Sequence, residues 1–190
     1  HAGMNAKKRK EVQEKWKSGE VPIVIATIAF GMGINKKNVR FVIHCNIPKS
    51  IENYYQEIGR AGRDGEPSDC LLYYNYADKI VQQKLIFRNK PKTDKDKEYQ
   101  KHQIEKINDM VSFVENVNDC RHFLLSNYFG ESKRFQCLDK CQNCKNQAMV
   151  ENINITELCR SIFDIVAKYD VSRTRIKAIL NGKNKKMIQH

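Results

Sequence analysis

The chain has 190 residues and a formal net charge of +12, from 34 Lys and Arg against 22 Asp and Glu. It contains no run of about 18 apolar residues, so the sequence predicts no membrane-spanning helix. The excess of positive charge favours a polyanionic partner, although a solvated lysine-rich surface would give the same composition. Seven cysteines without a recognisable secretory leader indicate an intracellular chain whose thiols stay reduced.

The N-terminal part alternates predicted helices and strands. A basic helix is predicted over residues 4–17, with Asn5 as its N-cap and Gly19 as its stop. Short apolar, β-branched runs predict three buried strands, over residues 21–27, 39–45 and 69–74. A helix over residues 51–56, capped by Ser50, separates the second strand from the third. This rhythm predicts an α/β domain with a parallel sheet.

Two segments follow these strands at or just beyond their carboxyl ends, where parallel sheets bind ligands. One is the small-residue loop 28–36, which contains Gly33. The other is the segment 56–65, which places Arg60 and Arg63 three residues apart among glycine and alanine. On a helix, this spacing would put both guanidinium groups on one face.

The two arginines carry planar forks of donors that suit phosphate oxygens and keep their charge at working pH. Their small neighbours leave space for a second body to approach closely. We therefore interpret the pair as an arginine finger, aimed at a nucleotide that is bound mainly by another domain. The residues alone leave one alternative, a surface helix end with two solvated arginines.

The C-terminal half is predicted to be helical. Helical periodicity covers residues 94–117, after a turn or linker at 88–97. Three more helices are predicted, over residues 121–129, 155–169 and 173–180, with Gly130 ending the first and Gly182 the last. A polar linker at 147–154 precedes the last two helices.

Four of the seven cysteines form a C-x16-C-x3-C-x2-C pattern: Cys120, Cys137, Cys141 and Cys144. Four thiolates at such spacings suit tetrahedral zinc, and they leave no coordination position open for an activated water. Disulfides or free core thiols are the alternatives. The other three cysteines are predicted to be packed thiols: Cys45, Cys70 and Cys159.

Residues 1–88 resemble the second RecA-like domain of the RecQ family of helicases. The resemblance rests on residues 1–3, on 26–36, which resembles helicase motif V, and on 51–65, which resembles motif VI. A small departure is Lys37, where many relatives have proline. The resemblance implies that Arg63 contacts the γ-phosphate of ATP, that Arg60 supports it, and that Gln56 couples the nucleotide to the domain interface.

The resemblance also implies roles for the small-residue loop and for the cysteines. Gly33 and Asn35 would lie at the ATP, with Asn35 facing the ribose, whereas Thr27 and Lys36 would contact DNA. RecQ helicases carry a four-cysteine zinc subdomain directly after the second RecA-like domain, and residues 120–144 resemble it. The implied organisation is a partial RecA-like parallel sheet with flanking helices (1–88), a helical zinc-binding subdomain (89–148) and the start of a winged-helix domain (149–190).

The activity implied by the resemblance is that of an ATP-dependent DNA helicase, moving 3′ to 5′ in DNA repair, recombination or replication. ATP and Mg²⁺ would be bound mainly by an upstream RecA-like domain of the same polypeptide, because the chain contains neither a phosphate loop nor a Walker-B acid. The nucleus is the expected compartment, with a bacterial cytoplasm as the alternative. Two other functions stay open: an RNA helicase of the same superfamily, or a non-catalytic zinc-stabilised module that binds or anneals DNA.

Overall fold

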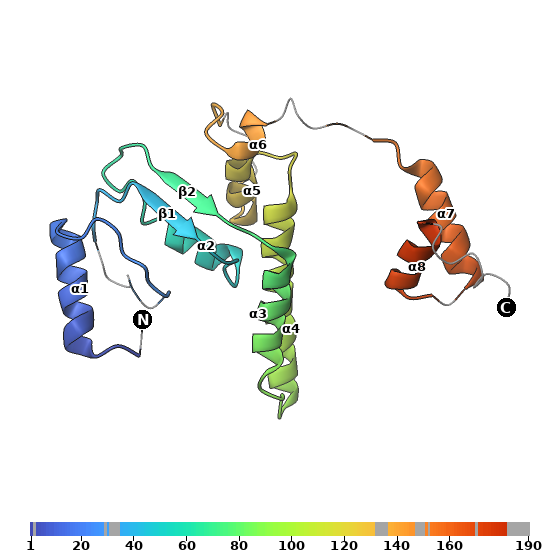
Figure 1. Ribbon diagram of the computed structural model, residues 1–190, viewed down its shortest axis with the longest axis horizontal. Helices are drawn as coiled ribbons and strands as arrows, with labels where there is room; N and C mark the ends of the chain where they lie inside the picture. Colours follow the sequence, from blue (N-terminus) through green and yellow to red (C-terminus); the bar gives the residue numbers. More distant parts are fainter. Residues whose placement is uncertain are drawn as a thin grey trace. The chain divides into compact units, whose positions relative to one another are not determined.

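The computed structural model describes residues 1, 3–28, 30, 35–131, 137–146, 151, 153–169 and 171–181 (Figure 1). It divides the chain into two compact units, His1–Ala148 and Met149–His190. The elements of the first unit are α1 (Ala6–Ser18), β1 (Phe41–His44), α2 (Ile51–Ile58), β2 (Asp69–Leu72), α3 (Tyr76–Phe87), α4 (Asp94–Glu115), α5 (Arg121–Tyr128) and α6 (Gln142–Lys145). The second unit contains α7 (Thr156–Lys168) and α8 (Arg173–Leu180).

The helix ends follow the capping residues that the sequence offers. Asn5 Oδ1 accepts from the Lys7 N–H at 2.9 Å at the start of α1, and Gly19 ends that helix with φ +87°. Ser50 Oγ accepts from the Asn53 N–H at 3.2 Å and caps α2. These three predicted helix signals are confirmed, because each satisfies backbone groups that a helix end leaves without partners.

The sheet is smaller than predicted. β1 and β2 pair in parallel, with Phe41 opposite Asp69 and His44 opposite Leu72. The predicted strand over 21–27 is wrong: in the part of the chain that the structure describes, this segment joins no ladder, and Ile25 is 97% exposed. A strand needs a neighbour to bond its backbone, but here the Val21 N–H donates to the Lys15 carbonyl of α1 at 3.1 Å.

Two of the three predicted packed thiols are also wrong. Cys45 and Cys70 are both exposed, whereas Cys159 is half-buried on α7. Cys45 follows the last residue of β1, and Cys70 lies on β2, which has β1 as its neighbour in the two-stranded sheet. A sheet of two strands is too small to bury the residues that its sequence pattern suggests.

Helix α3 was not predicted from the sequence. Asn75 and Asp78 form a capping box at its start, each side chain accepting from the other residue's backbone N–H. The helix packs along α4, and the two form a hairpin (Figure 1). The sequence signal was present as an Asn-x-x-Asp pattern, which is typical of a helix N-terminus.

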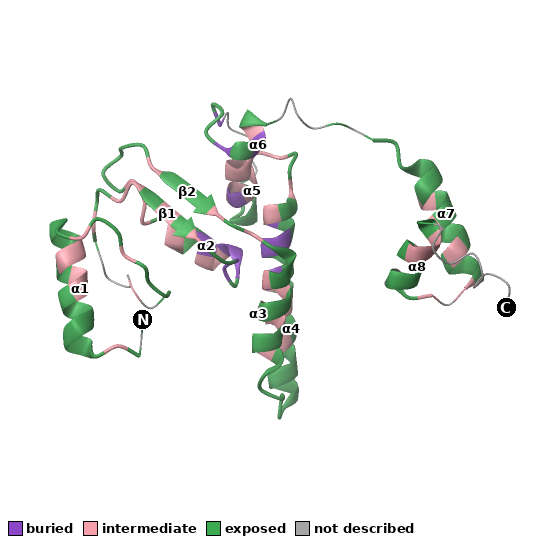
Figure 2. Cartoon of the chain, viewed as in Figure 1, coloured by how far each residue is buried: buried purple, intermediate pink, exposed green. Residues whose placement is uncertain are grey.

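The core of the first unit is formed by α2, α4 and α5 together with the residues just before α2. Ile47, Ile51 and Tyr54, in and before α2, pack with four buried residues of α4 and with Leu125 of α5. Those four residues are Ile107, Met110, Val111 and Phe113. Figure 2 shows the buried residues where α2 approaches α4. The predicted helix over 94–117 is confirmed as α4, with its apolar stripe facing this core.

In the second unit, α7 and α8 match the two predicted helices closely. The Asn154 side chain accepts from the Thr156 N–H at 3.0 Å at the start of α7. The predicted stop at Gly182 and residues 147–150 and 152 of the predicted linker lie outside the described residues. No helix among the described residues is both long and apolar enough to cross a bilayer.

Candidate functional site

The four cysteines of the spaced pattern converge in space. The Sγ atoms of Cys120, Cys137, Cys141 and Cys144 all lie within 4.8 Å of one another. Cys137 and Cys141 are buried, and the other two are half-buried. Cys120 is the N-cap of α5 and Cys141 the N-cap of α6, so two helix starts are directed at the cluster. At the start of α6, Cys141 Sγ accepts from the Cys144 N–H at 3.5 Å.

The spacing of the sulfur atoms fits a tetrahedral metal. Zinc–thiolate bonds of about 2.3 Å place neighbouring sulfurs about 3.8 Å apart, and Cys141 Sγ lies 3.9 Å from Cys120 Sγ. A disulfide would require about 2.05 Å, and all four cysteines are free thiols. The sulfur positions therefore favour zinc over the disulfide alternative.

The pKa values within the cluster differ strongly. Burial raises the pKa of Cys141, but N–H donation from the backbone of Cys144 and Arg121 outweighs burial and lowers it to about 6. Hydrogen bonding with the Cys141 side chain, followed by burial, raises the pKa of Cys144. Burial raises that of Cys137. Neighbouring thiols resist losing all their protons together unless a cation balances the charge, which a bound Zn²⁺ does.

Polar side chains that the sequence did not single out hold the cluster in place. Asn143, which is 5% exposed, donates through Nδ2 to the carbonyls of Asn116 and Asp119, both at 2.8 Å. Arg121 donates to the carbonyls of Phe113 and Val114 at the end of α4. These contacts tie α6 and α5 to α4. Their only sequence signal is proximity to the cysteines.

His122 contacts the cluster directly. Its Nδ1 lies 3.5 Å from Cys137 Sγ. One turn later on α5, the Ser126 hydroxyl donates to the His122 carbonyl at 3.0 Å. The four cysteines already complete a tetrahedral set, so the imidazole acts as a hydrogen-bond partner of a ligand. Such partners orient metal ligands and tune their basicity.

The two arginines lie in a turn and not on a helix. α2 ends at Ile58, and residues 59–64, hereafter the arginine turn, follow as consecutive turns. The prediction of one shared helix face is therefore wrong, because Gly59 takes over as C-cap. Arg63 is exposed, and its Nε donates to the Gly59 carbonyl at 3.1 Å; Arg60 is half-buried.

The arginine turn is held against the start of β1. The Gly62 N–H donates to the Val39 carbonyl at 2.9 Å. Arg40 contacts both carboxylate oxygens of Asp64, at 2.5 and 2.6 Å. Gly62 has φ +62°, and a Cβ there would lie 2.6 Å from Ser68 Oγ. Only glycine therefore fits without strain or displacement.

The other predicted site residues are not brought together by contacts among the described residues. Gln56, Thr27 and Asn35 are exposed. Lys36 is half-buried, with its Nζ 3.2 Å from the Lys17 carbonyl and 5.4 Å from the centre of the Trp16 ring. Gly33 lies outside the described residues. The roles of these residues stay predictions.

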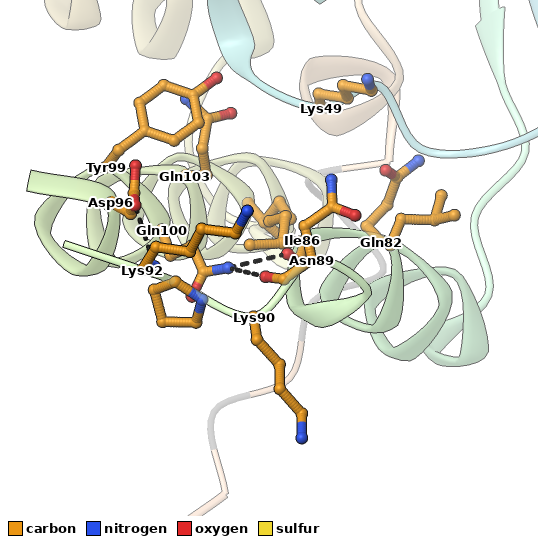
Figure 3. A pocket seen from close by; sticks show the side chains of 13 residues that line it. Lys49, Gln82, Ile86, Asn89, Lys90, Lys92, Asp96, Tyr99, Gln100 and Gln103 are labelled. Carbon is orange, nitrogen blue, oxygen red and sulfur yellow. Dashed lines mark hydrogen bonds between the residues drawn. The ribbon is translucent and has the colours of Figure 1, made fainter.

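A separate hollow of about 500 Å³ lies between the end of α3 and the start of α4 (Figure 3). Gln100 lines the hollow, and its side-chain amide donates to the carbonyls of Ile86 at 3.1 Å and Asn89 at 2.7 Å. Three lysines line it: Lys49, Lys90 and Lys92. It contains none of the predicted site residues, so the candidate chemistry resides in the cysteine cluster and the arginine turn.

Two known families match consecutive segments of the chain. Residues 1–65 match the helicase conserved C-terminal domain. Residues 76–145 match the RecQ zinc-binding family, which covers all four clustered cysteines. The first match includes the whole arginine turn, and the second runs from the start of α3 to the end of α6.

Individual relatives agree. The chain is 43% identical over 158 residues to ATP-dependent DNA helicase hus2/rqh1 of Schizosaccharomyces pombe, covering 83% of this chain and 12% of the relative. It is 38% identical over 179 residues to ATP-dependent helicase SGS1 of Saccharomyces cerevisiae, with 93% and 12% covered. For ATP-dependent DNA helicase Q1 of Mus musculus the identity is 40% over 167 residues, with 87% and 24% covered. The chain thus spans between about an eighth and a quarter of these relatives, and it belongs to the RecQ family of helicases.

Proposed function

We propose that the protein containing this chain is an ATP-dependent DNA helicase, and that this chain supplies the arginine finger, part of the DNA track and a structural zinc. The single observation that carries the proposal is the presence, in one unit, of an anchored arginine turn and a four-cysteine cluster. Relatives that align with 83% and 87% of this chain are named ATP-dependent DNA helicases, which supports the same activity here.

The arginines act at a nucleotide that this chain binds only from one side. An upstream RecA-like domain of the same polypeptide would bind ATP and Mg²⁺, and Arg63 would contact the γ-phosphate with support from Arg60. A cation supplied to the phosphoryl-transfer transition state accelerates the reaction by about 10³–10⁵. This gain is about 4–7 kcal/mol, well above the 0–1 kcal/mol or so of a surface ion pair.

The zinc has a structural role in this proposal. Four thiolates complete a tetrahedral shell, so zinc binding contributes to folding, on the order of 10 kcal/mol for such sites. DNA is the proposed partner, with Thr27 and Lys36 at the strand, translocation 3′ to 5′, and a winged-helix domain beginning with α7 and α8. We place the protein in the nucleus.

The first experiment measures DNA-stimulated ATP turnover by the full-length protein, wild type beside Arg63→Ala, at matched zinc content. We expect turnover by the wild type, a loss of at least 10³-fold in the variant, and unchanged DNA binding and melting temperature. Arg88→Ala, which changes an exposed arginine at the end of α3, is the matched control and should retain full turnover.

Two other outcomes would select a different function, and a third would change only the role of Arg63. Zinc-dependent DNA binding without ATP turnover by the wild type would favour the non-catalytic binding or annealing module. Turnover stimulated by RNA duplexes in place of DNA would favour an RNA helicase. Full turnover by Arg63→Ala would remove Arg63 from the site while leaving the helicase activity in place.

A further inference from the structure

A polar contact joins β1 to the last turn of α2, just before the arginine turn in the chain. His44, the last residue of β1, has a side chain that is 9% exposed, and its Nε2 lies 2.6 Å from Oε2 of Glu57, which is 17% exposed. A carboxylate oxygen only accepts, so Nε2 carries the proton and donates. The backbone of His44 is fixed in the sheet, where its carbonyl accepts from the Tyr73 N–H at 2.9 Å.

In free energy, this buried polar pair stabilises the fold less well than apolar side chains at the same positions would. The second ring nitrogen of His44, Nδ1, is buried without a hydrogen-bond partner among the described residues. The ring also lies 5.3 Å from that of Tyr54, in a region where apolar side chains would fill the space. Well-packed apolar residues stabilise a core at least as well as a buried polar pair, and a buried unsatisfied group in a native structure calls for an explanation.

The position of Glu57 suggests that explanation. It lies two residues before the first residue of the arginine turn, and its carbonyl accepts from the Arg60 N–H at 3.3 Å. The middle of the turn is bonded to Val39, and its end to Arg40. The start, middle and end of the arginine turn are therefore each attached to β1 or to the two residues before it.

We propose that His44 and Glu57 are a positioning pair, which sets the start of the arginine turn so that its guanidinium groups reach the ATP phosphates. This inference rests on the proposed function of the turn. By holding the Glu57 side chain on β1, His44 fixes the residue whose carbonyl bonds the Arg60 N–H, and with it the direction of the turn. A displacement of about 1 Å at a catalytic group costs up to about 100-fold in rate.

The test uses ATP turnover by the full-length protein. We expect His44→Ala to lower kcat about 10–100-fold while KM for ATP stays within about twofold, the signature of an interaction used only in the transition state. His44→Gln retains an N–H donor and should recover most of the loss. In His44→Ala combined with Glu57→Ala, the loss should not exceed that of the worse single variant, because the two residues act as a unit.

His102→Ala is the matched control. His102 also faces a glutamate, with Nδ1 3.7 Å from Glu105 Oε2, but both side chains are more than half exposed and lie on α4. This variant should turn over ATP at the wild-type rate. A wild-type kcat in His44→Ala would overturn the proposal, as would a loss that disappears when rates are divided by the folded fraction.

A second readout separates this inference from the proposed function. Amide hydrogen exchange over 59–64 should rise at least about tenfold in His44→Ala, with α4 unchanged, because the turn loses an anchor while the core stays closed. If the wild type turns over no ATP, the proposed function fails, and exchange alone decides whether the pair positions the turn. Unchanged exchange over 59–64 would overturn the positioning role in either case.

Discussion

At the scale of single residues, the arginine turn depends on a glycine that no other residue can replace without strain. Gly62 combines a positive φ of +62° with close neighbours, since an added Cβ would lie 2.6 Å from Ser68 Oγ and 3.0 Å from the Glu66 carbonyl oxygen. Backbone conformation and local contacts therefore act together at this position. The sequence shows the glycine, and the structure shows both reasons for it.

We expect Gly62→Ala to lower the free energy of unfolding by about 1–3 kcal/mol, the cost of a left-handed non-glycine residue with added crowding. Urea unfolding measures the change. Gly65→Ala is the matched control, because Gly65 has φ +86° but nothing within 4 Å of its added Cβ. Equal losses in the two variants would show that the contact with Ser68 contributes nothing.

At the scale of elements, α2 is joined to α4 by an ion pair beside the apolar core. Lys106 Nζ lies 2.7 Å from Glu52 Oε1. Burial raises the pKa of Glu52, but hydrogen bonds from Lys106 and Ser50 outweigh burial and lower the pKa to about 2. The folded pKa is below the unfolded value, so this pair stabilises the fold above about pH 4.5 and ceases to do so as the pH falls through about 2.

Glu52→Gln should therefore remove part of the acid dependence of stability. The Glu52 side chain is 39% exposed, so solvent screening limits the effect to about 0.5–1 kcal/mol. Chemical unfolding at pH 7 and at pH 3 measures it, with Glu98→Gln, an exposed substitution on α4, as the control. An identical pH dependence in Glu52→Gln and wild type would contradict the prediction.

The short helix α6 is attached to the rest of its unit through Asn143. Asn143→Ala removes both bonds to the carbonyls of Asn116 and Asp119 and leaves these groups without that partner. We expect zinc affinity to fall about 10–100-fold, as it does when outer-shell partners of metal ligands are removed. Chelator competition measures the affinity, and Gln142→Ala, at the exposed neighbour, should leave it unchanged.

How far the sequence predicts these elements depends on the kind of signal. Caps and apolar stripes are local, so α1, α2, α4 and α5 follow from the residues themselves. Strands depend on partners distant in sequence, which explains why 21–27 was predicted as a strand and lies outside the sheet. The cysteine spacing predicted a convergence that the structure contains. The contacts of Asn143 and His44 depend on packing between elements, which no spacing reveals.

At the scale of the whole molecule, the cysteine cluster and the arginine turn share one core. α5 begins at the cluster and contributes Leu125 to the core, while α2 contributes Ile51 and Tyr54 and leads into the turn. The Tyr55 ring lies 4.8 Å from that of Phe129 and adds a contact at the surface. We therefore expect the stability of the zinc-binding segment to be coupled to that of α2.

Removal of zinc by a chelator should therefore destabilise α2 as well as the segment that contains the four cysteines. We expect faster amide exchange over residues 120–145 and also over α2, with a lower melting temperature, because binding to the folded state alone stabilises the whole cooperative unit. Restoring zinc should reverse both changes. Faster exchange confined to 120–145 would show that the cluster unfolds independently of the core.

The shared core also affects how such a protein can change in evolution. The two matched families meet between residues 65 and 76, yet Ile47 and Ile51 on one side pack with Met110 and Leu125 on the other. A genetic exchange at that boundary would transfer half of a hydrophobic core and leave its complement behind. A chain that exchanged one segment alone, or lost its cysteines, would therefore have to repack the core on which α2 and the arginine turn rest.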